Sequence, residues 1–280
     1  MEKSIFTPKE IIQNNLNEGV GKVNQSLYRV ILFGILAGAF IAIGGEASNV
    51  AIHDIHNYGL AKFVAGIVFP VGLMMIVVIG GQLFTGNCLL FMGFLDHRLS
   101  LRQVLINWIT IFFSNFIGAA LIAVLVYYSK QFNMSGGQLG AFTINLAVGK
   151  VNLSFGQALA SGIMCNIIVC AAILMAGATK DVAGKCIGVF FTILAFVVSG
   201  FEHCVANMYY LTAGMLASHN NTYVEKAQEV YGLSQGQIDA LNIGSVFSKN
   251  LLPVTLGNII GGAVIIGGIF YVLHHDKKEN

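Results

Sequence analysis

Gly80-Gly81-Gln82-Leu83-Phe84-Thr85-Gly86-Asn87 interrupts the apolar run 60–95. A second polar interruption, Ser199-Gly200-Phe201-Glu202-His203-Cys204-Val205-Ala206-Asn207, divides the run 184–217. Both runs exceed the roughly 20 residues that a helix needs to cross a bilayer. Glycine permits backbone conformations that a helix cannot hold, and irregular backbone at membrane depth is stable only where it is buried or lines a wet cavity. The two stretches therefore predict two broken membrane helices.

The composition of the chain points to a lipid environment. Of its 280 residues, 56% are hydrophobic and only 10% are charged, whereas a soluble domain carries about a quarter charged residues. Apolar runs of spanning length lie at 27–52, 60–95, 104–129, 155–178, 184–217 and 246–273. The sequence therefore predicts an all-α membrane protein with six transmembrane helices, of which the second and fifth are broken.

The positions of the breaks predict an internal repeat. They fall in the second of the first three spans and in the second of the last three. Halves with an odd number of spans must insert in opposite directions. This is the inverted-repeat arrangement, in which paired broken helices lie beside a central solute site.

The chain is predicted to have three regions, which are an N-terminal amphipathic helix at 1–26, a channel domain at 27–273 and a C-terminal tail at 274–280. Thr7 is the expected N-cap of the first helix, with Pro8 at the first helical position and Glu10 completing a capping box. This helix either docks on the protein or lies in the membrane interface.

The distribution of basic residues gives the orientation. Ten Lys and Arg residues fall on the side of the two termini and five on the other side. The positive-inside rule then places both termini in the cytoplasm. A movable plug at the inner mouth is one role open to the N-terminal helix.

Several polar residues inside the apolar runs are candidates for function. Glu202 and His203 are costly in a membrane span and so indicate function, although a structural bond between helices is the alternative. Thr85 offers a hydroxyl, and Asn207 is able to share a face with His203 or to cap the backbone. Asn166 is read as a packing residue that hydrogen-bonds between helices.

The segment 141–152 is too apolar for a solvent loop and too short to span, which favours a re-entrant segment. Lys150 would then lie at a pore mouth and attract anions, the alternative being a solvated surface charge. No motif for nucleotide hydrolysis and no nucleophile–base pattern is present. We expect no cofactor, no metal site and no nucleic-acid partner, and the function is transport rather than catalysis.

These motifs resemble the formate/nitrite transporter family, which includes channels for formate, nitrite and hydrosulfide. The resemblance rests on Leu83-Phe84-Thr85-Gly86-Asn87, Gly149-Lys150, Asn166, Gly200-Phe201-Glu202-His203 and Asn207. It implies an aquaporin-like fold, a pore in each protomer of a homopentamer, and a place in the cell inner (plasma) membrane. Aquaporins themselves match poorly, because their paired Asn-Pro-Ala motifs are missing. Gln82 stands where many family members carry an acidic residue, which leaves the anion open.

The resemblance also implies roles for individual residues. Apolar constrictions would be formed by Phe69, Leu73, Leu83 and Phe196. The chamber between them would be lined or polarised by Thr85, Lys150, Asn166 and His203, with Glu202 and Asn207 supporting the region of the histidine.

Our hypothesis for the mechanism is that Lys150 concentrates the anion, Thr85 orients it, and His203 donates a proton directly or through water. The neutral acid would then cross the constriction and lose its proton on the far side. A competing version keeps the anion charged throughout. The alternatives outside this class are a pore for neutral solutes, a membrane enzyme that uses Glu202 and His203 as acid and base, and a structural scaffold.

Overall fold

The computed structural model describes residues 5–274, and this part of the chain is helical apart from connecting segments and one isolated bridge between Ile5 and Thr179. Six helical segments are long and apolar enough to cross a membrane: Leu27–Ile52, Tyr58–Ile79, Leu101–Tyr128, Phe155–Ala176, Val182–Ser199 and Ile243–His274. The six predicted spans are confirmed. Residues 1–4 of the predicted N-terminal region and 275–280 of the predicted tail lie outside the described residues.

Both predicted breaks are present, and each begins at a glycine with positive φ. The second span runs through α3 (Tyr58–Val68) and α4 (Val71–Ile79), breaks at 80–83, and resumes as α5 (Phe84–Asn87) and α6 (Leu90–Leu95). The fifth runs through α10 (Val182–Ser199), breaks at 200–203, and resumes as α11 (Cys204–Ala217). Gly80 has φ +103° and Gly200 has φ +73°, values that side chains with a Cβ disfavour.

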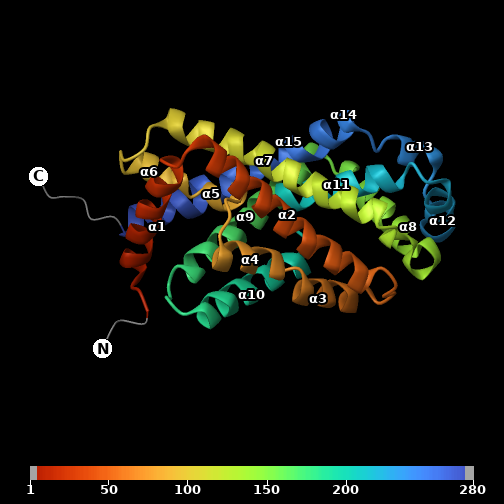
Figure 1. Ribbon diagram of the computed structural model, residues 1–280, viewed down its shortest axis with the longest axis horizontal. Coiled ribbons are helices and arrows are strands. Elements are labelled where there is room, and N and C mark those ends of the chain that lie inside the picture. The colour runs from red at the N-terminus through yellow and green to blue at the C-terminus, as the bar shows by residue number, and fades with distance from the viewer. Residues whose placement is uncertain (1–4, 275–280) are drawn as a thin grey trace, which may run out of the picture.

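The other elements complete an elongated bundle (Figure 1). Their bounds are α1 (Pro8–Val23), α2 (Leu27–Ile52), α7 (Leu101–Tyr128), η1 (Gln131–Asn133), α8 (Met134–Val151), α9 (Phe155–Ala176), α12 (Asn221–Tyr231), α13 (Gln235–Asp239), α14 (Ile243–Ser245), η2 (Val246–Leu251), α15 (Leu252–Ile259), η3 (Ile260–Gly268) and α16 (Ile269–His274). The segment 141–152, predicted to be re-entrant, belongs almost entirely to α8, which packs against α11 and α12. We call the two ends of the bundle the α1 end and the α12 end.

The two halves of the chain repeat the same hydrogen bonds at their breaks. In the first half, Asn115 donates from Nδ2 to the carbonyls of Gly34 and Gln82, and its Oδ1 accepts from the N–H of Phe84. In the second half, Asn258 donates to the carbonyls of Gly162 and Glu202 and accepts from the N–H of Cys204. Figure 1 shows α3–α4 and α10 running in opposite directions. The inverted repeat predicted from the position of the breaks is thus confirmed.

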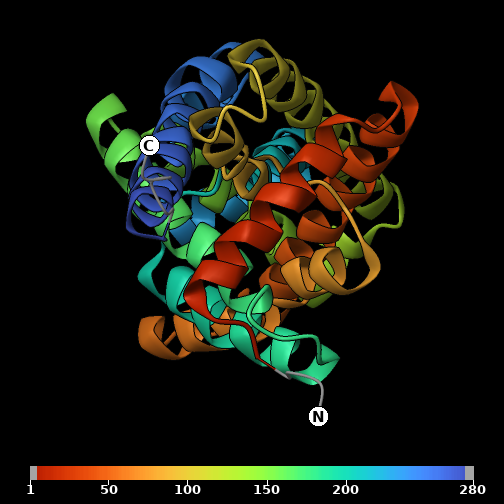
Figure 2. The same ribbon diagram turned by 90° about the vertical axis from the view of Figure 1, so that its left-hand side faces the viewer.

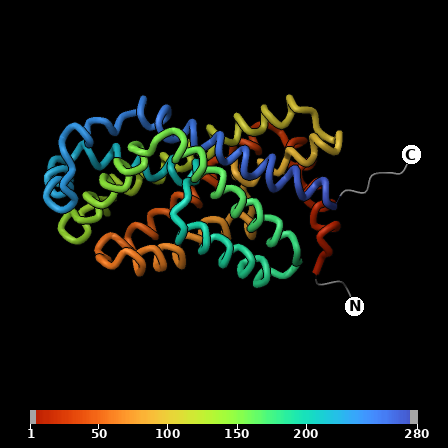
Figure 3. The backbone as a smooth tube through the Cα atoms, turned by 180° about the vertical axis from the view of Figure 1, so that it is seen from behind, coloured from red at the N-terminus to blue at the C-terminus, as the bar shows by residue number. Residues whose placement is uncertain are grey.

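Close helix crossings hold each half together, and glycine makes them possible. The first span, α2, packs against the third, α7, and α9 packs against α15. Figure 3 shows α9 in green crossing the blue sixth span. A Cβ on Gly118 would overlap the carbonyl oxygen of Ile35, and one on Gly261 would overlap that of Ile163. Small residues let membrane helices approach closely enough for dispersion contacts to hold them.

Helix α1 docks on the protein, which decides between the two readings of this segment. Thr7 caps it, and Glu10 completes the expected capping box. Ile12 and Leu16 are each only 3% exposed, and the helix contacts α6, α7, α9 and α16. Figure 2 shows α1 lying across the end of the bundle.

Candidate functional site

The two broken helices meet at a hydrogen bond in the centre of the protein. Thr85, in α5, and His203, the N-cap of α11, come from different halves of the chain, and Oγ1 of Thr85 lies 2.9 Å from Nε2 of His203. Thr85 is fully buried and His203 is 3% exposed. The breaks make this contact possible, because the polar side chain at the end of each break faces the other half of the chain.

The other nitrogen of His203 identifies the tautomer. The backbone N–H of Ala206 donates to Nδ1 over 3.1 Å, as an N-cap bond. A nitrogen that accepts a hydrogen bond carries no proton, so the neutral ring holds its proton on Nε2. His203 therefore donates to Oγ1 of Thr85, whose own hydroxyl proton is free to point elsewhere. Before the ring gains a positive charge, Nδ1 must give up its bond to Ala206.

The backbone of Thr85 is anchored by the fourth span. Nδ2 of Asn166 donates to the carbonyl of Thr85 over 3.2 Å and to that of Asn258 over 2.7 Å. Sγ of Cys170 donates to the same Thr85 carbonyl over 3.3 Å. Asn166 is thus a crosslink between the two halves. Both N–H groups of its amide are used in bonds to backbone carbonyls.

Lys150 and Glu202 form an ion pair beside the second break. Nζ of Lys150 lies 2.8 Å from Oε1 of Glu202, and both side chains are about nine-tenths buried. Oε2 of Glu202 accepts from Asn207 over 2.6 Å and from Asn250 over 3.2 Å. The carboxylate is therefore satisfied on both oxygens. The structure brings together three of the predicted residues, and Lys150 is a paired cation rather than a solvated one.

The apolar residues that the resemblance assigned to constrictions are buried. Phe69 and Phe196 pack edge to face with ring centroids 5.9 Å apart, and the ring of Phe196 lies 6.0 Å from that of His203. Leu73 and Leu83 are 2% and 3% exposed. Leu83 immediately precedes α5 and so lies next to the turn that carries Thr85. Phe196 and Leu83 thus lie next to the polar centre, and the constriction formed by these four residues stays a prediction.

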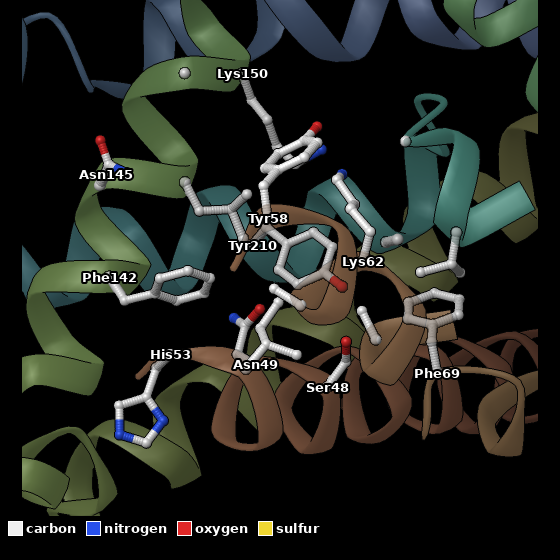
Figure 4. A pocket seen from close by; sticks show the side chains of 18 of the residues that line it. Ser48, Asn49, His53, Tyr58, Lys62, Phe69, Phe142, Asn145, Lys150 and Tyr210 are labelled. Carbon is white, nitrogen blue, oxygen red and sulfur yellow. The ribbon is translucent and has the colours of Figure 1, made fainter. Parts of the chain in front are cut away.

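A cavity of about 780 Å³ leads from the α12 end to His203. Phe69, Phe196 and Lys150 are among the residues that line it, and Figure 4 shows Lys150, Lys62 and Tyr210 within it. Nζ of Lys150 lies 5.3 Å from the centroid of the Tyr210 ring. The cavity connects the surface to the polar centre.

Three residues of this region were missed by sequence reasoning. Asn250 lies at the start of the sixth span and donates to Glu202 and to the carbonyl of Lys150. Tyr210 and Lys62 line the cavity, and Lys62 stacks on Tyr58 at 5.6 Å. Within the described residues Lys62 has no carboxylate partner, unlike Lys150. The one sequence signal for this network was a Glu or Gln followed five residues later by an Asn, which occurs as Glu202–Asn207 and again as Gln82–Asn87.

The geometry can be compared with known proteins. The family model described as formate/nitrite transporter matches residues 9–272. The chain is 35% identical to the formate channel FocA of Haemophilus influenzae, over 94% of this chain and 92% of that protein. It is 34% identical to the formate channel BtFdhC of Bacillus thuringiensis, over 98% of this chain and 97% of that protein.

The fold of the chain also resembles the folds of solved channel structures. A pentameric formate channel with formate bound aligns with a TM-score of 0.79 and 30% identity, covering 89% of this chain and 98% of that one. The aquaglyceroporin of Plasmodium falciparum aligns with a TM-score of 0.50 and 13% identity, covering 88% of this chain and all of that one. The latter likeness concerns architecture alone, and it agrees with the expected aquaporin-like arrangement.

Proposed function

Because the chain belongs to the formate/nitrite transporter family, we propose that it conducts formate, or a weak-acid anion of the same size and charge, through a pore in each protomer. The observation that carries this proposal is the hydrogen bond between Thr85 and His203, because His203 lines the cavity and packs beside Phe196 of the Phe69–Phe196 pair. The relatives named above are formate channels and not enzymes. The rival assignment of Glu202 and His203 as catalytic acid and base is therefore set aside.

The physical problem for such a channel is the cost of a charge in an apolar passage. Transfer of an ion from water to a medium of low dielectric constant costs several kcal/mol even after relaxation. The cationic side chains of Lys62 and Lys150 line the outer cavity and lower the cost of entry. Glu202 neutralises most of the positive electrostatic field of Lys150. Lys62 therefore supplies the larger share of the attraction for the anion.

At the centre, Thr85 and His203 replace the water that the anion loses. The hydroxyl of Thr85 is able to donate to a carboxylate oxygen while it accepts from Nε2 of His203. In the protonation version of the mechanism, formate takes its proton here and crosses the barrier as the neutral acid. His203 gives up a proton readily only if it is first protonated on Nδ1, which the bond from Ala206 opposes. A proton that reaches formate through water is consistent with a neutral His203 that orients the acid.

The relatives and the charge distribution support proposals for the assembly and the location of the chain. The solved formate channel named above is described as pentameric, and we propose a homopentamer for this chain. We also propose the cell inner membrane, with the α1 end and both termini in the cytoplasm, because the six-span topology predicted from the sequence assigns ten basic residues to that side and five to the other. Nitrite and hydrosulfide remain candidate substrates because, like formate, they are small monovalent anions of weak acids.

The test is stopped-flow uptake into proteoliposomes with a pH-sensitive dye inside. We expect formate uptake well above that of empty liposomes, with one proton entering for each formate. Nitrite, hydrosulfide, glycerol and water are run in parallel. An anion current without proton movement would overturn the protonation step, and flux of glycerol or water alone would favour a neutral-solute pore. No flux of any solute would favour a scaffold.

A further inference from the structure

The first span contains a buried carboxyl group that has no part in the central site. Glu46 lies in the second half of α2 and is 5% exposed. Its Oε2 accepts a hydrogen bond from the hydroxyl of Tyr209 in α11, and its Oε1 has no hydrogen-bond partner within residues 5–274. An ionisable side chain at membrane depth is costly and marks, by default, a path for an ion or a proton.

No basic side chain compensates Glu46 in the described part of the chain. The helices that pack against α2 are α3, α4, α7, α8 and α11. Their basic residues are Lys62, Arg102 and Lys150, and none of the three lies within ion-pair distance of Glu46. An isolated carboxylate in such surroundings is far more costly than the neutral acid. Glu46 thus differs from Glu202, whose charge is balanced by Lys150 at 2.8 Å.

Glu46 lies one turn from the wall of the outer cavity. Asn49 follows it by three residues and so shares its face of α2. Asn49 lines the cavity, and so does Tyr210, the residue after Tyr209 (Figure 4). Nδ2 of Asn49 is buried and, like Oε1 of Glu46, has no hydrogen-bond partner within residues 5–274. Buried polar atoms of this kind bind ordered water, and such water would connect Glu46 to the cavity.

We propose that Glu46 holds a proton and exchanges it with the solute in the outer cavity, with the hydroxyl of Tyr209 holding the carboxyl group in place. This role rests on the proposed function, because the solute is a weak-acid anion. It supplies the proton that His203 is poorly placed to give, since the bond from Ala206 keeps Nδ1 of the histidine unprotonated.

The exchange conserves protons and charge. Because Tyr209 donates to Oε2, that atom is the carbonyl oxygen of the acid and the proton lies on Oε1. The O–H bond of Glu46 breaks, an O–H bond forms on the anion through the intervening water, and the products are formic acid and the Glu46 carboxylate. The carboxylate regains its proton from the water of the cavity. Donor and acceptor are both carboxyl groups, and a proton passes most readily between groups of similar acidity.

The protonated carboxyl group has its own infrared signature. The experiment records the C=O stretching band of a protonated acid in the purified full-length protein at neutral pH, in a detergent without ester groups. We expect such a band in the unmodified protein and its loss in Glu46→Gln. Tyr209→Phe should keep the band and move it to higher frequency, because a hydrogen bond to the carbonyl oxygen lowers this frequency.

The transport measurement uses proteoliposomes with a pH-sensitive dye inside. Glu46→Gln keeps the shape of the side chain and an oxygen that accepts from Tyr209, but it has no acidic proton to give. We expect formate uptake to fall about tenfold or more in this variant. Glu46→Asp keeps the acid and should retain more uptake than Glu46→Gln, the opposite order to that of a residue needed only for packing. Glu225→Gln, the same change at an exposed carboxylate of α12, is the matched control and should leave uptake unchanged.

The outcomes separate this role from the proposed function. Persistence of the infrared band in Glu46→Gln would show that another group carries the proton and would overturn the role. Formate uptake in Glu46→Gln equal to that of the unmodified protein would overturn it as well and leave conduction standing. Absence of uptake in the unmodified protein would overturn conduction, whereas loss of the band in Glu46→Gln would still assign the proton to Glu46.

Discussion

Oγ1 of Thr85 and Nε2 of His203 lie 2.9 Å apart, and this bond joins the two broken helices at the centre of the protein. Each of the two residues is also held by a second hydrogen bond, so that one side-chain atom of each remains to contact a solute. The backbone of Thr85 is held by Asn166, and Nδ1 of His203 caps α11. The hydroxyl of Thr85 and the Nε2–H of His203 are therefore oriented toward each other before any solute arrives.

The first prediction separates the two roles of His203. His203→Ala removes both the N-cap and the pore donor, whereas His203→Asn is able to keep a cap through its side-chain oxygen. We expect both variants to lose formate flux by about tenfold or more. Only His203→Ala should also lose about 1 kcal/mol of stability, the typical value of an N-cap.

Flux is measured in proteoliposomes and stability by thermal unfolding in detergent. Thr85→Ser keeps the hydroxyl and should retain most of the flux, while Thr85→Val should lose it. If Thr85→Val conducted formate as well as the unmodified protein, the central hydrogen bond would have no part in conduction.

The second prediction concerns the buried ion pair of Lys150 and Glu202. Removing one partner of such a pair leaves an uncompensated buried charge, which costs about 3–5 kcal/mol. We expect Lys150→Met and Glu202→Gln each to lower the free energy of unfolding by an amount of this order. The double variant should recover part of the loss, because neither charge then remains. Additive losses in the double-mutant cycle would show that the two residues are not coupled.

The third prediction tests Asn258 as the residue that holds the second break. Asn258→Leu leaves the carbonyl of Glu202 and the N–H of Cys204 without their partners, and it removes an additional bond from the carbonyl of Gly162 in α9. Each unsatisfied buried group costs about 1–3 kcal/mol, so we expect the variant to accumulate poorly and to unfold at lower temperature. Asn145→Leu is the control, because Asn145 is half-buried on the cavity wall and its side chain makes no hydrogen bond within residues 5–274. Equal stability of the two variants would contradict the proposed anchoring.

The fourth prediction concerns the helix crossings. A methyl group at Gly118 would overlap the carbonyl oxygen of Ile35, which is backbone and so is not able to move aside cheaply. We expect Gly118→Ala to separate the first and third spans and to lower the yield of folded protein in size-exclusion chromatography. Gly149→Ala meets nothing within 4 Å and should be harmless. A normal elution profile for Gly118→Ala would show that the crossing tolerates a wider spacing.

The fifth prediction is a pH dependence of α1 docking. Burial lowers the pKa of the Lys22 ammonium below its ordinary value of 10.5, and Glu18 opposes this shift. Between the lowered pKa and 10.5, docked α1 binds fewer protons than free α1. Docking therefore strengthens as the pH rises through that interval and is independent of pH below it.

The measurement is the mobility of a spin label on Gly21→Cys, an open position of α1, in a background with Cys186→Ser because the remaining cysteines are buried. We expect the mobility to fall as the pH is raised toward 10.5. The trend should disappear in Lys22→Met. A trend that survives this substitution would have to come from another group.

The amino-acid sequence by itself determined the six spans, the two breaks, the capped N-terminal helix and the family motifs. These features depend on local properties: the length of an apolar run, a glycine in the left-handed region at Gly80 and Gly200, and a Thr–Pro–Glu pattern at the start of α1. Each follows from a short stretch of chain and needs no distant partner.

Only the tertiary structure decided which charged side chains have a partner of opposite charge. Lys150 and Glu202 are 52 residues apart and Lys22 and Asn87 are 65 apart, and Asn250 completes a network that no nearby residue signals. Electrostatic interactions depend on distance and burial in space, so a lysine in a loop has the same appearance in the sequence whether it is paired or free. The fold pairs Lys150 with Glu202 and leaves Lys22 on the neutral amide of Asn87. This distinction arises only when segments that are far apart in the chain pack together.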